Sequence, residues 1–95
     1  MEETTTQDET SKPGSVYDFI AGMVDAMAAI AWQKLGLHRD MMTGNIEKDL
    51  AEAKVAIDLT AHLATFIYPR LDAEDKRVLE NLVKDLRLNY VQQNK

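Results

Sequence analysis

Cysteine is absent from this 95-residue sequence, which also holds only four glycines and two prolines. Without cysteine the chain can form neither a disulfide nor a cysteine-type zinc site, and this composition fits a reducing compartment. The four glycines make no Walker or dinucleotide-binding pattern, and no serine lies in a nucleophile elbow. These absences exclude several common enzyme classes.

Long apolar runs and a basic leader are missing as well. Residues 1–15 are polar and acidic, so no signal peptide is expected. Asp18, Asp25 and Lys34 interrupt the longest apolar region, Val16–Leu37, which argues against a transmembrane helix. We therefore expect a cytoplasmic protein without a membrane partner. The net charge of −5 also opposes binding to nucleic acid.

The chain is long enough for one domain but not for a large core. A protein of this size buries only about two thirds of its unfolded surface on folding. Small proteins often add a disulfide, a metal or a partner subunit. Because cysteine is absent, a partner subunit is the expected supplement here.

Apolar residues recur at helical spacing in three segments, and strand signals are absent. We predict helices over about 15–35, 49–68 and 72–92, following a disordered acidic tail at residues 1–14. The very short second link makes the last two helices antiparallel neighbours. The predicted fold is an all-α three-helix hairpin or bundle, a single helical domain at 15–95 that is completed by dimerisation.

Short polar residues and chain breakers set the predicted helix ends. Ser15, Asp49 and Asp72 are the expected N-caps. Gly36 is the expected left-handed residue after the first helix, and Pro69 stops the second.

The first helix carries more apolar surface than one core contact requires. Its apolar arc is roughly 200° wide, against about 100° for a helix that covers one core. One seam contains Tyr17, Val24, Ala28, Ala31 and Leu35. The other seam is predicted to mediate self-association, most simply as a two-fold dimer, through Val16, Phe19, Ile20, Met23, Met27 and Ile30. Alternatively, the other two helices straddle the first and bury both seams.

Polar residues give little sign of catalysis, and no catalytic, cofactor-binding or metal-binding residue is predicted. Asp58 and His62 share a helix face at i, i+4 spacing and could be half of a metal site, but no Glu-x-x-His pair completes one. Asp18 and Asp25 indicate a solvated or hairpin-facing stripe rather than an acid/base dyad. We expect a protein that is not an enzyme.

The order and spacing of many residues give a family resemblance over about residues 17–91. They are Phe19, Leu35-Gly36, Thr43-Gly44, Asp49-Leu50, Ala53, Ile57-Asp58, Leu71, Glu74-Asp75, Leu79, Leu82, Leu86-Arg87 and Tyr90-Val91. With these residues the chain resembles the short bacterial proteins grouped as domain of unknown function 1844. It departs from them at Met42, where a proline is usual, and at the link 67–70.

The resemblance implies a small helical cytoplasmic protein of bacteria and no particular activity. It draws notice to Asp58 and Arg87, for which we predict a buried ion pair that sets helix register. The leading functional hypothesis is a non-enzymatic adaptor or regulator that binds itself and an unidentified protein. Alternatives are a translation- or nucleic-acid-associated factor, and a small-ligand or metal binder.

Overall fold

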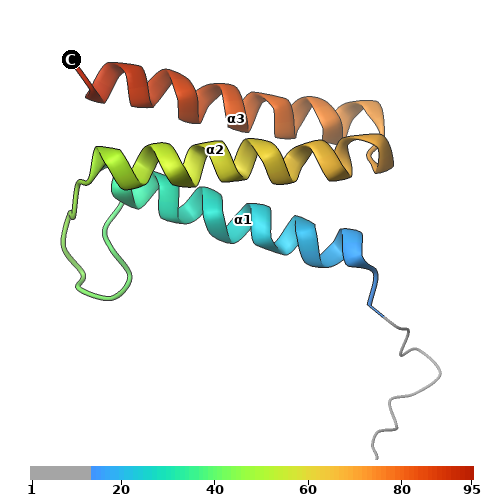
Figure 1. Cartoon of the computed structure of the whole chain (residues 1–95), viewed down its shortest axis with the longest axis horizontal. Helices are drawn as coiled ribbons and strands as arrows, with labels where there is room; N and C mark the ends of the chain where they lie inside the picture. The colour runs from blue at the N-terminus through green and yellow to red at the C-terminus, as the bar shows by residue number, and fades with distance from the viewer. Residues whose placement is uncertain (1–13) are drawn as a thin grey trace, which may run out of the picture.

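The protein is all-α in the part of the chain that the structure, a computed structural model, describes, residues 14–95. It consists of α1 (Val16–Lys34), α2 (Leu50–Ile67), a short 3-10 helix η1 (Tyr68–Arg70) and α3 (Ala73–Gln93). No strand occurs within residues 14–95, which confirms the predicted class (Figure 1). The predicted acidic tail lies outside the described residues, except for Gly14.

Each helix begins one residue later than predicted, because the predicted first residue is its N-cap. The side chains of Ser15, Asp49 and Asp72 accept hydrogen bonds from backbone N–H groups two or three residues further on, at 3.1, 3.1 and 2.8 Å. A capping residue keeps an extended backbone while it satisfies an unpaired N–H group of the first turn. The caps are therefore right, and the boundaries move by one residue.

The end of α1 is a Schellman motif. Gly36 has φ +84°, and its N–H donates to the Gln33 carbonyl at 3.0 Å. The Leu37 N–H donates to the Trp32 carbonyl at 3.1 Å, which is the second bond of this motif. The left-handed backbone at Gly36 turns the chain into a loop whose second left-handed residue is Gly44. The predicted end of the first helix is confirmed.

α2 is the central helix of the three. α1 packs along one side of it and α3 packs on the other, while α1 and α3 make few contacts with each other (Figure 1). The short link through η1 makes α2 and α3 antiparallel neighbours, as predicted. Consequently α2 uses two of its sides for contacts within the chain and has a third side left over.

The core consists of two clusters that meet at Leu82. One lies at the end of α1 and contains Ala28, Ala31, Leu35, Ala53, Ala56, Ile57 and Leu86. The other lies toward η1 and contains Val24, Ala64, Ile67, Leu79 and Val83. Five of these twelve residues are alanine, so α1 and α2 can approach closely, but each contact buries little apolar area.

We predict that Leu86→Ala lowers the free energy of unfolding by about 2–5 kcal/mol, because Leu86 is fully buried in this small core. Leu88→Ala is the matched control in the same helix, since Leu88 is 53% exposed and the expected loss is within about 0.5 kcal/mol. Urea unfolding at one protein concentration measures both. Equal losses would contradict the described core.

Candidate functional site

The two apolar seams of α1 differ in how exposed their side chains are. Most of one seam is in the core: Val24, Ala28, Ala31 and Leu35 are at most 5% exposed. The other seam is largely exposed, although its residues Ile20 and Met27 also pack against the two core clusters. Its exposed fractions are 60% at Val16, 64% at Phe19, 52% at Met23 and 39% at Ile30, and it also contains the half-buried Ile20 and Met27. All six residues predicted for self-association therefore lie on one uncovered or partly covered side of α1.

α2 extends this uncovered surface. Val55, Leu59, His62 and Phe66 follow one another at steps of four, three and four, so they form one stripe on the helix. Val55 is 67% and Phe66 51% exposed, and His62 is exposed between them. This stripe was not predicted from the sequence, because helical periodicity alone cannot tell which side of a central helix its neighbours cover. A signal was present, since apolar residues lie on more than one side of α2.

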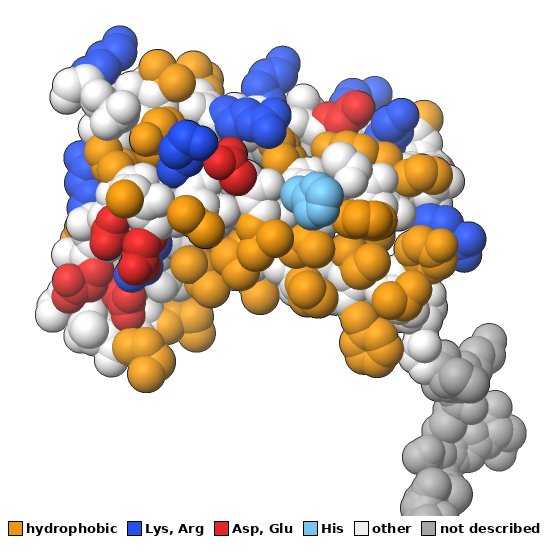
Figure 2. All heavy atoms as spheres, viewed as in Figure 1, with side chains coloured by type: hydrophobic (Ala, Val, Ile, Leu, Met, Phe, Trp, Pro, Cys, Tyr) orange, Lys and Arg blue, Asp and Glu red, His pale blue; other side chains and the backbone are white. Residues whose placement is uncertain are grey.

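We call this combined surface the outer face. It comprises Val16, Phe19, Ile20, Met23, Met27 and Ile30 of α1, and Val55, Leu59, His62 and Phe66 of α2. Figure 2 shows hydrophobic side chains as a continuous band over these two helices, with the histidine beside it. Between the helices runs a groove of about 490 Å³, lined by Met27, Ile30, Val55, Ala56 and Leu59, with Glu52 at its end. Such a surface can bind an apolar partner surface.

Charged side chains near the outer face are paired with one another. The Lys34 ammonium lies 3.1 Å from the Glu52 carboxylate, and the hydrogen bond and charge of Glu52 raise the pKa of Lys34. Likewise, Asp58 raises the pKa of Lys54, chiefly through a hydrogen bond of 2.8 Å. Away from this face, burial raises the pKa of Tyr68. His62 is the one titratable member of the outer face.

The predicted buried ion pair between Asp58 and Arg87 is wrong. Both residues are exposed, and the Asp58 carboxylate accepts its hydrogen bond from Lys54 of the same helix. Arg87 lies across a groove of about 200 Å³ from Asp58, together with Tyr90. Position 58 lies at the outer edge of the contact between α2 and α3, where an i, i+4 lysine reaches the carboxylate while both side chains stay more than half exposed.

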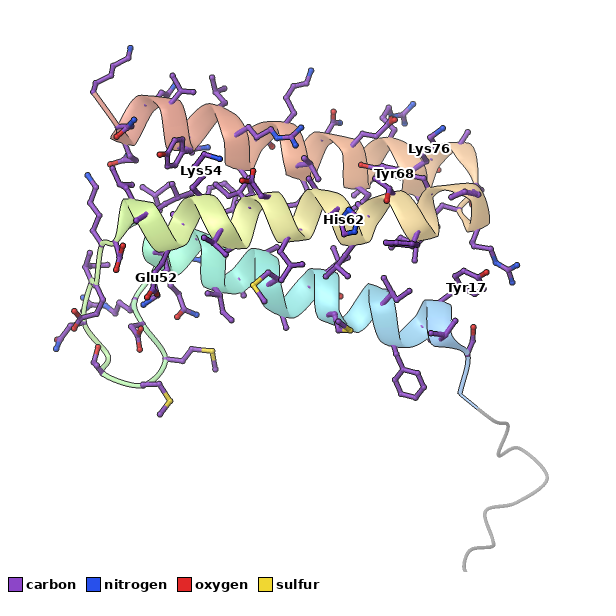
Figure 3. All side chains as sticks on the ribbon, in the orientation of Figure 1. Tyr17, Glu52, Lys54, His62, Tyr68 and Lys76 are labelled. Atoms are coloured by element: carbon purple, nitrogen blue, oxygen red, sulfur yellow. The ribbon has the colours of Figure 1, made fainter. Side chains whose placement is uncertain are left out.

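The remaining polar residues that could serve in catalysis or metal binding do not gather at one site. Asp18 and Asp25 line different grooves beside α1. The His62 ring lies edge-on to Phe66, with 5.2 Å between the ring centroids (Figure 3). In residues 14–95, no three His, Asp, Glu or Cys side chains gather as metal ligands. Within residues 14–95, no helix is both long enough and apolar enough to cross a membrane, which is a separate finding from the lack of a metal site.

The fold and the outer face define a small all-α protein whose apolar surface extends beyond its core. A family model described as domain of unknown function (DUF1844) matches residues 16–92, so the chain belongs to this family. No curated protein and no solved structure matches the chain. The match confirms the resemblance and assigns no activity.

We predict that Asp58→Ala and Arg87→Ala change the free energy of unfolding additively in a double-mutant cycle. The reason is that Asp58 is bound to Lys54 and both members of the cycle are solvent-exposed. Thermal or urea unfolding of the two single variants and the double variant measures this. A coupling energy well above the experimental error would show that the two side chains do interact.

Proposed function

We propose that this protein is a non-enzymatic helical interaction protein, an adaptor or regulator, that forms a two-fold dimer through its outer face. One observation carries the proposal. On α1 the buried contact positions include Ala28 and Ala31, whereas the larger Phe19 and Met23 are more than half exposed. A monomer gains stability by burying its largest apolar side chains. The large apolar side chains that α1 leaves exposed therefore favour a second protein surface over these residues.

The size of the outer face supports a dimer. The exposed parts of its large side chains add up to an area of the order of the ~800 Å² that one partner contributes to a standard interface. Monomers typically keep their largest apolar patch to about 300–600 Å². The face is thus large enough for a stable interface and large for a protein that stays alone.

A second copy of the chain is the occupant that the chemistry favours. In a two-fold dimer each copy presents the same patch, so the patch must be compatible with itself. The outer face meets this condition because none of its residues carries a fixed charge, and Glu52 at the end of its groove is paired with Lys34. The chain's first thirteen residues offer no large apolar side chain after Met1, so they supply nothing that could replace a second copy.

Dimerisation would leave α3 and the loop between α1 and α2 for the further protein partner of an adaptor. Nucleic acid is less favoured, because Lys34 and Arg39, two cations that a phosphate-binding patch would need, are engaged locally. Lys34 pairs with Glu52, and the Arg39 guanidinium donates to the Gly44 carbonyl at 3.1 Å. We also propose a cytoplasmic location, which the lack of cysteine favours.

We predict that Met23→Glu converts the dimer to a monomer, since each dimer would have to bury two new carboxylates. The expected increase in the dimer dissociation constant is roughly a hundred-fold or more. Light scattering over a dilution series measures the molar mass. Val78→Glu is the matched control, because Val78 is 62% exposed but lines the groove between α1 and α3, away from the outer face.

A mass of one chain for the unmodified protein at every concentration would overturn the proposal. If the dimer persists in Met23→Glu but dissociates in Val78→Glu, the interface lies at the groove between α1 and α3 instead of the outer face. Circular dichroism of both variants shows whether the helices are retained, so that loss of association is not confused with unfolding.

A further inference from the structure

His62 is the one member of the outer face whose charge can change near neutral pH. It continues the stripe of Leu59 and Phe66, and both neighbours in the stripe are apolar. Its ring lies edge-on to the Phe66 ring at a centroid distance of 5.2 Å. Figure 3 shows His62 on the side of α2 that is turned to the viewer, and Figure 2 shows a histidine with hydrophobic side chains along part of its border. A surface that covers Leu59 and Phe66 therefore also covers His62.

Building on the proposed dimer, we infer that self-association is controlled by pH, with neutral His62 allowing the dimer and protonated His62 opposing it. The physical reason is desolvation. A neutral imidazole can enter an apolar interface at modest cost, whereas an imidazolium without an acidic partner loses its hydration there. In the isolated chain His62 is exposed, so either form is hydrated by water.

The carboxylate one helical turn from His62 is already paired with a cation, and α3 adds no net negative charge. On α2, Asp58 lies one turn away, but its carboxylate is bound by the Lys54 ammonium at 2.8 Å. The α1 side chains of the outer face are all apolar. On α3, which runs antiparallel beside α2, the stretch between Leu79 and Tyr90 carries Glu80, Lys84, Asp85 and Arg87, so its two carboxylates and two cations add no net negative charge.

The direction of the effect follows from linkage. The dimer binds fewer protons than two separate chains, so association releases protons and weakens as the pH falls. An imidazole in water takes up a proton near pH 6.5. With one His62 from each copy in the interface, two protons are excluded per dimer. The dissociation constant at pH 5.5 should then exceed that at pH 7.5 by about a hundred-fold.

The experiment measures the dimer dissociation constant of the full chain at pH 5.5 and pH 7.5, by sedimentation velocity over a dilution series. The variants are His62→Gln, which stays neutral, and His62→Arg, which stays charged. His38→Gln is the matched control, because the second histidine of the chain lies in the loop against Trp32, outside the outer face. Both pH values lie above the usual range of carboxylates, so histidine is the side chain that titrates between them.

The expected result is a dimer of the unmodified protein that weakens about a hundred-fold at pH 5.5. His62→Gln should remove this dependence, His62→Arg should associate weakly at both pH values, and His38→Gln should behave like the unmodified protein. A dimer of unchanged affinity at the two pH values would overturn the inference and leave the proposed dimer standing. The inference also fails if His62→Gln keeps the pH dependence. A monomer at pH 7.5 would instead overturn the proposed function itself.

Discussion

The close contact between α1 and α2 is the interaction on which the rest of the structure depends. Alanines line it from both sides, with Ala28 and Ala31 on α1 and Ala53 and Ala56 on α2. Small side chains bring two helix backbones together, but each contributes little apolar area. The contact therefore aligns the two helices, while several of their larger apolar side chains, such as Phe19 and Phe66, remain exposed on an adjoining side.

α3 supplies the larger side chains that the contact between α1 and α2 lacks. Leu79, Val83 and Leu86 pack against α2, and Leu86 and Leu82 also join the cluster at the end of α1. α3 thereby completes the core that α1 and α2 begin, and none of its residues belongs to the outer face. A further helix would be needed to cover that face, and residues 14–95 contain none beyond α1, α2, η1 and α3.

Charged side chains lie at the border of the outer face and not within it. Ion pairs border the outer face at Glu52 with Lys34 and at Asp58 with Lys54, where both partners of each pair keep contact with water. Exposed pairs of this kind add little to stability, but they keep charges off the apolar surface. The exception is His62, a polar side chain within an apolar stripe, and the proposed pH control of association rests on this position.

Local features of this protein were determined by the sequence alone. Caps at Ser15, Asp49 and Asp72, the left-handed Gly36 and the stop at Pro69 depend on neighbours a few residues away, so the three helices could be predicted to within a residue. The excess apolar arc of α1 was also visible, because it is a property of one helix. Tertiary structure decided which seam is buried, added the stripe through His62 to the outer face, and replaced the expected partner of Asp58 with Lys54. Each of these depends on how α2 is rotated between its two neighbours, and the helical period by itself leaves that rotation open.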